Sequence, residues 1–293
     1  MPEIRVFKQF LNQTYKSILS MTRLNSLFIL LCMVIATGCA SMSGGRGLNL
    51  YSVEDDRQLG EATAAQIAAS PQDYPILDRV KYKSAYAQLE NIMNSILKSG
   101  ALPNADKFEW KVNIIDQPVL NAFAVPGGHL YFYTGLMKYL DDESQLAGVM
   151  AHEIAHICLG HSTRQMTKQM GVSTIIALVT AYKNNAATQL GGAVVNGLAS
   201  MAFSRSDEYQ ADEYAVRSLA GTKYDPRGVA GFFIKLENEG QTSGRTPAFL
   251  STHPSPVDRI EQIYKTWEAT GSKEGVNGGK FEADYKKLKT YLP

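Results

Sequence analysis

The chain has 293 residues, of which 45% are hydrophobic and 19% are charged, and its formal net charge is +1. This length allows one large domain or a domain with appendages, and the apolar fraction is enough for a sizeable core. A charge balance so close to zero argues against a nucleic-acid-binding protein, which usually presents a strongly basic face.

The first 38 residues have the pattern of a bacterial signal peptide. Their apolar run, residues 24–35, reads LNSLFILLCMVI and is shorter than the roughly 20 residues of a membrane-spanning helix. The run ends at A-T-G-C, which resembles a lipoprotein box, so we expect cleavage before Cys39 and lipid attachment to it. Met21 is an alternative start that would give a leader of more usual length. An uncleaved N-terminal membrane anchor is the alternative interpretation.

The residue after the cysteine bears on location. Ala40 is not the aspartate that is associated with inner-membrane retention, so the same resemblance implies anchoring in the inner leaflet of the outer membrane. Residues 39–52 are small and rich in glycine, which is typical of a flexible tether. Cys158 would be the only cysteine left unmodified, so we expect no internal disulfide.

The next segments predict two helices and three strands. Helical patterns cover residues 53–69 and 77–98. Residues 108–115 predict a strand, and residues 121–125 and 129–134 predict two more, joined as a hairpin by the turn at 126–128.

A long helix should follow the hairpin and end near Gly160, with Asp141 or Asp142 as its cap. Residues 172–203 predict two helices around a loop. Further helices are expected over residues 204–219, 226–237 and 256–269 and in the tail. The elements together predict an α+β fold that is mostly α-helical.

Residues 152–156 read H-E-I-A-H, and two of the five histidines of the chain stand in this stretch. On an α-helix, positions i and i+4 lie on one face, so His152 and His156 can direct their imidazoles at one zinc ion. Glu153 would then reach a water in the open coordination position and act as its base. Apolar residues on both sides predict that this helix is buried. A core helix with two hydrogen-bonded histidines is the alternative.

The motif lacks a third ligand. His161 is the nearest candidate, but an uninterrupted helix would place it about half a turn from the face of the motif, and its spacing does not match H-E-x-x-H-x-x-G-x-x-H. The stretch S-R-S-D-E-Y-Q-A-D, residues 204–212, offers Asp207, Glu208 and Asp212 instead. Glu208 and Asp212 share a helix face, so Glu208 could bind the metal while Asp212 accepts the N–H of a ligand histidine. A solvated acidic face is the alternative.

Four motifs occur in a specific order: N-A-F-A-V-P-G-G-H-L-Y-F-Y-T-G-L, H-E-I-A-H-I-C-L-G-H, S-R-S-D-E-Y-Q-A-D-E-Y-A and T-H-P-S-P-V-D-R-I. Over about residues 55–268 the chain resembles the zinc metallopeptidase family of the HtpX-like and CAAX prenyl proteases, in particular its soluble bacterial lipoprotein branch. The resemblance implies a gluzincin: a zincin-type domain, residues 53–270, whose active-site helix packs on a small antiparallel β-sheet. Residues 271–293 would form a C-terminal tail.

The resemblance also implies the chemistry of the site. One zinc ion per chain would be held by His152, His156 and Glu208, with Glu153 as the base. An edge strand near the active-site helix would bind substrate through main-chain hydrogen bonds, and residues 121–125 or 129–133 could serve. A purely structural hairpin is the alternative, and His129 is expected to be structural.

His253 stands between a threonine and a proline, and the resemblance places it near the zinc. It could stabilise the oxyanion formed during hydrolysis. It could instead occupy the open zinc position and keep the enzyme silent until substrate displaces it, which is the hypothesis we favour.

These features predict a zinc-dependent endopeptidase, lipid-anchored in the periplasm, that cuts misfolded or exposed envelope proteins in protein quality control. The alternative is a zinc-stabilised periplasmic chaperone or binding protein with latent proteolysis. The expected partners are unfolded or misfolded proteins and, through Cys39, the membrane, with no nucleic acid. The sequence makes no prediction of the oligomeric state.

Overall fold

The computed structural model describes residue 49 and residues 51–168, 201–243, 247–254 and 258–293. The predicted leader, nearly all of the predicted tether and most of the segment 172–203, in which two helices were expected, lie outside the described residues; residues 201–203 are described and are not helical. In chain order the elements are α2 (Val53–Ala68), α3 (Lys83–Leu97), β1 (Lys111–Ile115), β2 (Ala122–Val125), β3 (His129–Tyr133), α4 (Thr134–Tyr139), α5 (Glu143–Cys158), α8 (Arg205–Leu219), α9 (Gly228–Ser243), α10 (Ala248–Thr252), α11 (Arg259–Ala269) and α12 (Glu282–Thr290). Residues 161–168 are also helical. The α+β, mostly helical fold class is confirmed.

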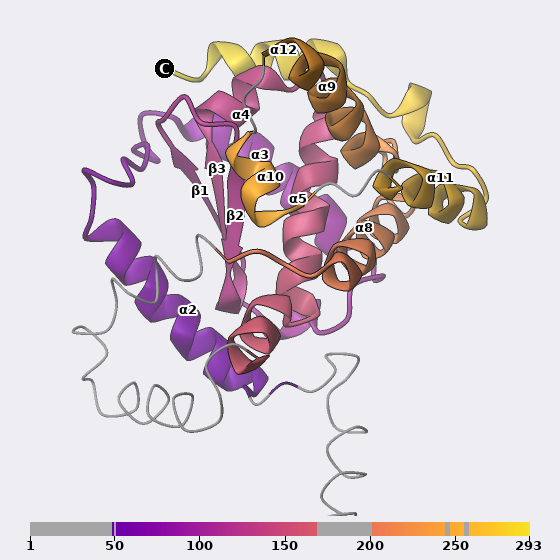
Figure 1. Cartoon of the computed structure of the whole chain (residues 1–293). Coiled ribbons are helices and arrows are strands. Elements are labelled where there is room, and N and C mark those ends of the chain that lie inside the picture. Colours follow the sequence, from indigo (N-terminus) through magenta and orange to yellow (C-terminus); the bar gives the residue numbers. More distant parts are fainter. Residues whose placement is uncertain (1–48, 50, 169–200, 244–246, 255–257) are drawn as a thin grey trace, which may run out of the picture. The chain divides into compact units, whose positions relative to one another are not determined.

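The three strands form one small mixed sheet in the order β1-β3-β2 (Figure 1). The hairpin is antiparallel as predicted, with Ala122 opposite Phe132 and Val125 opposite His129. However, β1 runs parallel to β3, so the sheet is not wholly antiparallel. The reason is that all five residues of β3 are buried and take the centre. The chain therefore crosses from β1 past the end of β3 and enters β2 on the other side.

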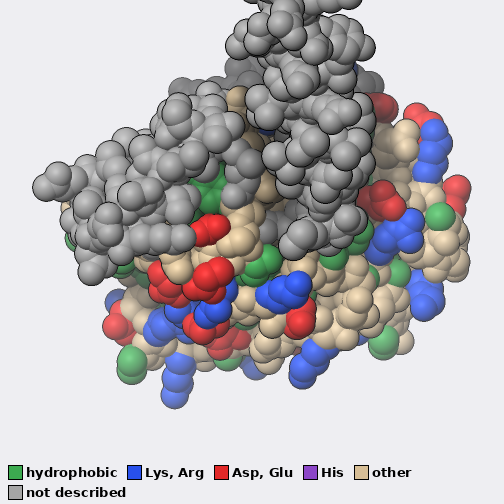
Figure 2. All heavy atoms as spheres, turned by 90° about the horizontal axis from the view of Figure 1, so that it is seen from below, with side chains coloured by type: hydrophobic (Ala, Val, Ile, Leu, Met, Phe, Trp, Pro, Cys, Tyr) green, Lys and Arg blue, Asp and Glu red, His purple; other side chains and the backbone are tan. Residues whose placement is uncertain are grey.

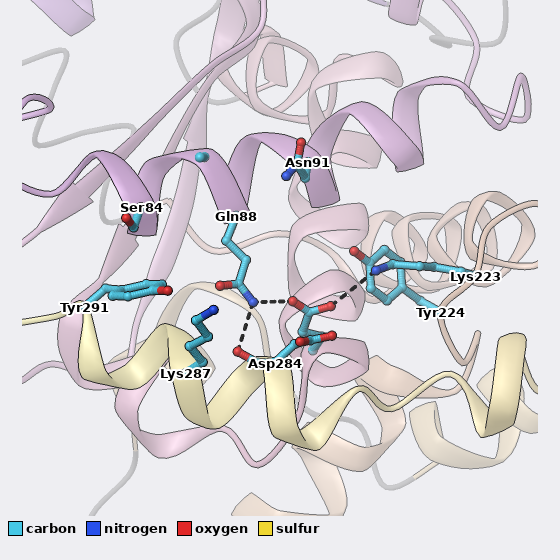
Figure 3. Close-up of a pocket in the computed structure, with 10 residues that line it drawn as sticks. Ser84, Gln88, Asn91, Lys223, Tyr224, Asp284, Lys287 and Tyr291 are labelled. Atoms are coloured by element: carbon cyan, nitrogen blue, oxygen red, sulfur yellow. Dashed lines mark hydrogen bonds and ion pairs between the residues drawn. The ribbon is translucent and has the colours of Figure 1, made fainter.

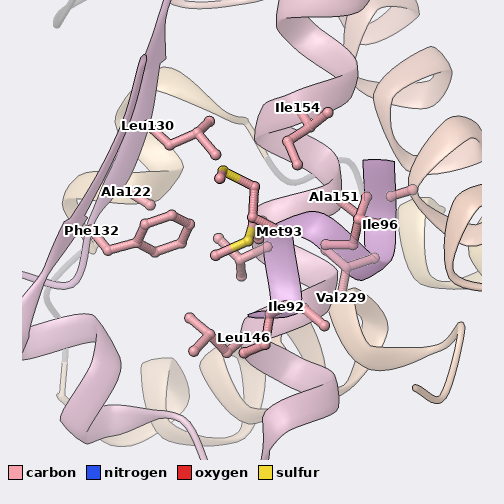
Figure 4. Packing of buried hydrophobic residues seen from close by; sticks show 14 of the residues in the cluster. Ile92, Met93, Ile96, Ala122, Leu130, Phe132, Leu146, Ala151, Ile154 and Val229 are labelled. Atoms are coloured by element: carbon pink, nitrogen blue, oxygen red, sulfur yellow. The ribbon is translucent and has the colours of Figure 1, made fainter. Parts of the chain in front are cut away.

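Alternation along the strands gives the sheet two apolar faces. One face packs against α3 and α5 through side chains that include Leu130 and Phe132 of β3 (Figure 4). Tyr131 and Tyr133 point the opposite way and meet Ile67 of α2. Because both faces are covered, α5 lies against a rigid layer, which is what a buried site on this helix needs.

Helices α5 and α9 touch backbone to backbone. A Cβ on Gly148 of α5 would lie 2.2 Å from the Val229 nitrogen, and a Cβ on Gly228 would lie 1.8 Å from the Ser144 carbonyl oxygen. Each distance is far below van der Waals contact, so glycine is required at both positions for this close approach.

Helix α3 begins at Lys83, not at Leu77 as its apolar pattern predicted. The Asp78 side chain accepts hydrogen bonds from the backbone N–H groups two and three residues later, at 3.0 and 2.7 Å. The Leu77 N–H donates to the Ile114 carbonyl at 2.8 Å. This side-chain turn and the contact with β1 use the groups that an earlier helical turn would need.

The C-terminal tail contributes to the same core. Tyr285 of α12 is fully buried, and its hydroxyl donates a 2.6 Å hydrogen bond to the Met137 carbonyl. None of the helices that the structure describes combines the length and apolar character needed to cross a membrane. On the face seen in Figure 2, acidic and basic side chains are interspersed.

Candidate metal centre

Helix α5 brings three polar side chains into the core. Every residue of this helix is buried, including His152, Glu153 and His156. Of the two predicted caps it is Asp142 that begins the helix, because its carboxylate accepts the Gln145 N–H at 2.9 Å. Histidines and a glutamate on a fully buried helix destabilise the fold unless they have polar partners.

Helix α8 supplies those partners, and its cap decides which acids face α5. Ser204 and Asp207 form a capping box: the serine hydroxyl accepts the Asp207 N–H at 3.2 Å, and the Asp207 carboxylate accepts the Ser204 N–H at 3.2 Å. Asp207 also pairs with Arg164. Of the three candidate acids, Glu208 and Asp212 are therefore the two whose carboxylates reach His152 of α5.

Four buried side chains converge on one point. His152, His156, Glu208 and His253 each offer one donor atom, and these atoms all lie within 4.8 Å of one another. The Nε2 atoms of His152 and His156 are 3.0 Å apart, and Nδ1 of His253 is 3.3 Å from Nε2 of His152. Oε1 of Glu208 lies 3.1 Å from Nδ1 of His253 and 3.6 Å from Nε2 of His156.

These separations fit a metal ion. Nitrogen ligands about 2.0–2.1 Å from a tetrahedral zinc ion lie about 3.3 Å from one another. The donor set is three imidazole nitrogens and one carboxylate oxygen, which zinc accepts. Without an ion, ring nitrogens 3.0 Å apart would compete for one proton in a site that water does not reach. The residues present therefore fit a divalent metal.

Asp212 lies behind one of these histidines. Its Oδ1 is 2.9 Å from Nδ1 of His152, the ring nitrogen turned away from the cluster. A proton on Nδ1 leaves the lone pair of Nε2 directed at the other donors. Asp212 thus occupies the place from which a carboxylate fixes the tautomer of a ligand histidine.

His161 lies behind His156 as Asp212 lies behind His152, and this role was not predicted from the sequence. Its Nδ1 lies 2.8 Å from Nδ1 of His156, and its Nε2 lies 3.3 Å from Oε1 of Gln210. The prediction assumed an uninterrupted helix, but α5 ends at Cys158 and Gly160 has φ of +62°. The chain turns there, which brings His161 back against the motif as a support of His156.

Two aromatic rings enclose the cluster. Phe203 stacks on His156 with ring centroids 4.0 Å apart, and Phe249 of α10 stacks on His253 with centroids 4.4 Å apart. The Phe203 N–H donates to the Thr252 carbonyl at 3.1 Å, and the Phe249 N–H donates to the Leu120 carbonyl at 3.1 Å. These two bonds tie α10 to the start of α8 and to the approach to β2. The sequence offered no signal for either ring, because phenylalanine is ordinary in a core.

Burial and hydrogen bonding move the pKa values of the cluster in opposite directions. Burial alone would lower the pKa of His152, but its contacts with Asp212 and Glu208 outweigh burial and raise that pKa to about 9. Burial and the charge of His152 hold the pKa of His156 well below its usual range. Burial would raise the pKa of Glu208, but the charges of His253 and His152 hold it well below. Near neutral pH, Glu208 is ionised and His156 is neutral, the forms that bind metal, whereas His152 is protonated and would release the proton on Nε2 when a metal ion binds.

Glu153 differs from Glu208. Its Oε1 lies 3.4 Å from Nε2 of His253 and has no hydrogen-bond partner among the described residues. Burial raises the pKa of Glu153, and the charges of His253 and His152, with a smaller contribution from the backbone N–H of Ala124 in β2, oppose part of that shift. Glu153 is thus a carboxylate with a strengthened affinity for a proton, beside the cluster and beside β2.

Only one of the two predicted substrate strands has a free edge. β3 has a neighbour on both sides, whereas β2 is the last strand at its side within the described residues. The Tyr133 N–H donates to the Asn121 carbonyl at 3.2 Å. By antiparallel alternation, the main-chain groups of Ala122 and Ala124 then face away from β3. The expectation that 129–133 could serve as the edge is therefore wrong.

Arg259 is a further residue of the site that was not predicted from the sequence. Its side chain is fully buried and contacts both Glu208 and Asp212. A possible signal was its place in the motif T-H-P-S-P-V-D-R-I, six residues after His253.

A separate polar cavity of about 370 Å³ lies at the other end of α5 (Figure 3). Gln88 donates hydrogen bonds there to the Glu143 carboxylate and, at 3.1 Å, to the Asp284 carbonyl. Lys223 Nζ lies 3.7 Å from the same carboxylate. The cavity contains charged groups of both signs, of which Glu143 and Lys223 pair with each other. We assign it no role in the metal centre.

The sequence profile of peptidase family M48 matches residues 83–267. A β-barrel assembly-enhancing protease of Escherichia coli (strain K12) is 30% identical over 218 residues, which are 71% of this chain and 43% of that protein. A putative β-barrel assembly-enhancing protease of Vibrio cholerae is 38% identical over 152 residues, 48% of this chain and 31% of that protein.

A mitochondrial relative matches over a similar length. The mitochondrial metalloendopeptidase OMA1 of Schizosaccharomyces pombe is 25% identical over 222 residues, which are 76% of this chain and 64% of that protein. The aligned part therefore spans less than two thirds of the length of each of these three relatives.

Proposed function

This chain belongs to peptidase family M48 and is a metalloprotease, and on that premise we propose that it is a zinc-dependent endopeptidase of the bacterial envelope. The family membership predicted from the four sequence motifs is thereby confirmed. The observation that carries the proposal is the buried set of four donor atoms within 4.8 Å, with an unpartnered Glu153 oxygen beside it.

In the proposed site His152, His156 and Glu208 hold the zinc ion. A zinc ion bound there would polarise the substrate carbonyl and lower the pKa of a water towards about 7. Asp212 and His161 keep the Nδ1 protons of the two histidines in place, so that both Nε2 lone pairs face the ion.

Glu153 moves the proton in this mechanism. Its carboxylate accepts a proton from the attacking water as the water oxygen bonds to the peptide carbon. The same carboxyl then gives that proton to the leaving nitrogen as the C–N bond breaks, so atoms and charge balance. A raised pKa suits both steps, because the carboxylate must first hold the proton and then release it.

We propose that the substrate chain adds to the free edge of β2. The outward N–H and C=O groups of Ala122 and the outward C=O of Ala124 can pair with an extended peptide, while the Ala124 N–H lies at Glu153. Such pairing recognises backbone more than side chains, and only an unfolded segment can present its backbone in this way. This supports misfolded or exposed envelope proteins as substrates, in periplasmic quality control.

His253 closes the proposed site. Its Nδ1 completes the four-donor set, and its ring is held between Phe249 and the cluster. A side chain in this place occupies the position that the attacking water needs. We therefore propose that the described arrangement is a silent state and that substrate must displace His253.

The location is proposed from the leader and from the relatives. The lipoprotein-like box at Cys39 supports lipid anchoring in the inner leaflet of the outer membrane. The names of the E. coli and V. cholerae relatives, which refer to β-barrel assembly, are consistent with the bacterial envelope. Metabolic labelling with palmitate tests this: wild type should be labelled, and labelling that persists in Cys39→Ser would refute the site.

The decisive experiment on function compares Glu153→Gln with wild type for zinc content and for cleavage of an unfolded protein such as casein. The substitution keeps size and removes the proton acceptor, so zinc should stay at one per chain while the rate falls at least about 100-fold. Glu213→Gln, at a half-exposed glutamate on α8 that pairs with Arg217, serves as the matched control. Cleavage that survives Glu153→Gln would exclude this mechanism. Zinc binding without cleavage in wild type would favour a chaperone.

A further inference from the structure

One cation is buried next to the proposed metal ligands. Arg259, the first residue of α11, is fully buried. Its Nε and Nη2 donate to the two oxygens of Asp212 at 2.7 Å each. Its Nη1 lies 2.7 Å from Oε2 of Glu208 and donates to the Pro254 carbonyl at 3.2 Å. The guanidinium also lies over the Phe233 ring, 4.2 Å from its centroid.

Arginine is the side chain that can make all of these contacts at once. Its planar guanidinium offers five donors in a fixed fork, whereas the ammonium of lysine is a point charge. A buried charge is tolerated only where its partners are complete. Here every acceptor belongs to the metal centre or to the segment next to it: Glu208, Asp212 and the carbonyl that directly follows His253.

The contacts define how Glu208 can bind. Oε2 lies 3.5 Å from Nε2 of His152, but the guanidinium of Arg259 lies only 2.7 Å away and competes with an ion for this oxygen, whereas Oε1 faces His253 and His156 at 3.1 and 3.6 Å. Glu208 would thus offer a single oxygen to the ion and leave room for another ligand. Arg259 also holds Asp212 so that Oδ1 stays 2.9 Å from Nδ1 of His152.

The same guanidinium reaches the segment that closes the site. Its bond to the Pro254 carbonyl places the peptide after His253 at a fixed distance from the carboxylate of Glu208. The acidic ligand and the closing histidine come from segments about 45 residues apart, as given by the Glu208–His253 contact. Arg259 is a shared partner of both segments.

We propose that Arg259 is a positioning residue of the metal centre. It orients Glu208 so that only one carboxylate oxygen faces the ion, and it fixes the position of His253 relative to that carboxylate. The proposal rests on the proposed function, since it takes the four-donor cluster as the zinc site. It predicts that the contributions of Arg259 and His253 to metal affinity depend on each other.

The test measures zinc affinity, by competition with a chromophoric chelator, in wild type, Arg259→Lys, His253→Ala and the double variant. Lysine keeps the charge but cannot contact both carboxylates and the Pro254 carbonyl, so zinc should bind 10- to 100-fold more weakly, on the order found for supports of metal ligands. His253→Ala should weaken zinc binding in wild type and much less in Arg259→Lys. The visible spectrum of the Co²⁺-loaded protein should change in Arg259→Lys.

Arg227→Lys is the matched control. Arg227 also grips one aspartate, Asp225, with Nε and Nη2, at 3.0 and 2.9 Å, and also lies over an aromatic ring, Trp267. It has no contact with the donor cluster among the described residues. Its conversion to lysine should leave zinc affinity and the Co²⁺ spectrum unchanged.

Two results would overturn the proposal. One is wild-type zinc affinity in Arg259→Lys. The other is an equal effect of His253→Ala in both backgrounds, which would show that Arg259 does not position His253. If Arg259→Lys unfolds without metal, the zinc concentration that restores folding becomes the readout, and failure to fold at saturating zinc would assign Arg259 a merely structural role.

These outcomes are separable from a failure of the proposed function. Wild type that binds no zinc, or Glu153→Gln that still cleaves, would refute the zinc peptidase. A zinc-loaded, Glu153-dependent wild type with unchanged Arg259→Lys would refute only the role of Arg259.

Discussion

At the scale of single residues, the two proposed ligand histidines of α5 contact different partners. His152 meets the carboxylate of Asp212, whereas His156 meets the neutral imidazole of His161. A carboxylate raises the basicity of a ligand histidine more than a neutral ring does. With one carboxylate and one neutral imidazole behind the two histidines, the site would keep its affinity for the ion with only one added negative charge in the core.

His161 therefore gives a testable prediction. His161→Ala should weaken zinc binding about tenfold, because His156 loses the acceptor that fixes its Nδ1 proton. His161→Gln should restore most of the affinity, since its side-chain oxygen can accept the same proton. Chelator competition measures both. Equal losses in the two variants would show that His161 acts through packing alone.

His253 gives a prediction of opposite sign. At saturating zinc, His253→Ala should raise the rate of casein cleavage on the order of tenfold. This corresponds to about 1.4 kcal/mol of free energy that substrate no longer needs to displace the side chain. The expected gain arises because the side chain that must be displaced is gone. An unaltered or abolished rate would count against a closing role and would favour direct participation in the reaction.

At the scale of elements, the sequence predicted most of the local structure and the four donor residues of the cluster, but not all of the residues that support them. The hairpin, the active-site helix and the acidic helix were predicted because their periodicity and caps are local features. The parallel pairing of β1 was not, because it depends on which strand is buried on both faces. Arg259 was not predicted, because its partners lie 47 and 51 residues away in the chain, as the contacts with Asp212 and Glu208 show.

The contact between α5 and α9 can be tested with two glycines. Gly148→Ala should lower the free energy of unfolding by about 1–3 kcal/mol, because its Cβ would meet the Val229 nitrogen. Gly231→Ala in α9 is the matched control, since the nearest atom would be 3.5 Å away on the Gln145 side chain. The control should be neutral or stabilising by up to about 1 kcal/mol, from helix propensity. Urea unfolding measures both, and equal effects would contradict the close approach.

At the scale of the whole molecule, stability should depend on pH through a histidine outside the site. Burial lowers the pKa of His129 at the start of β3, and the nearby charge of Glu61 opposes that shift only in part. The unfolded chain therefore takes up a proton more readily than the folded protein does. This contribution to stability is fully present above the unfolded pKa of 6.5 and is lost as pH falls from there towards the lowered folded pKa.

The measurement is urea unfolding at pH 7.5 and 5.5 in the presence of zinc, for wild type and His129→Gln. The loss in wild type should exceed that in the variant, by at most about 1.4 kcal/mol per pH unit for one proton. Identical losses in the two proteins would show that the acid sensitivity lies elsewhere.

A metal ion bound at the proposed site should also stabilise the whole protein. A ligand that binds only the folded state adds about 2.7 kcal/mol at 100 times its dissociation constant. Chelation should therefore lower the melting temperature of wild type, and zinc should restore it. His152→Ala should melt at a temperature that no longer responds to zinc, and a full response in that variant would place the ion at another site.

Helix α10 is five residues long, and two backbone hydrogen bonds tie it to its neighbours, from the amides of Phe203 and Phe249. Short segments with few backbone bonds open locally at a small fraction of the global unfolding free energy. Local opening of α10 would free His253 and break both hydrogen bonds, so both amide protons would then exchange with solvent. Their hydrogen exchange rates would thus report, residue by residue and without any substrate, how often the catalytic centre becomes accessible.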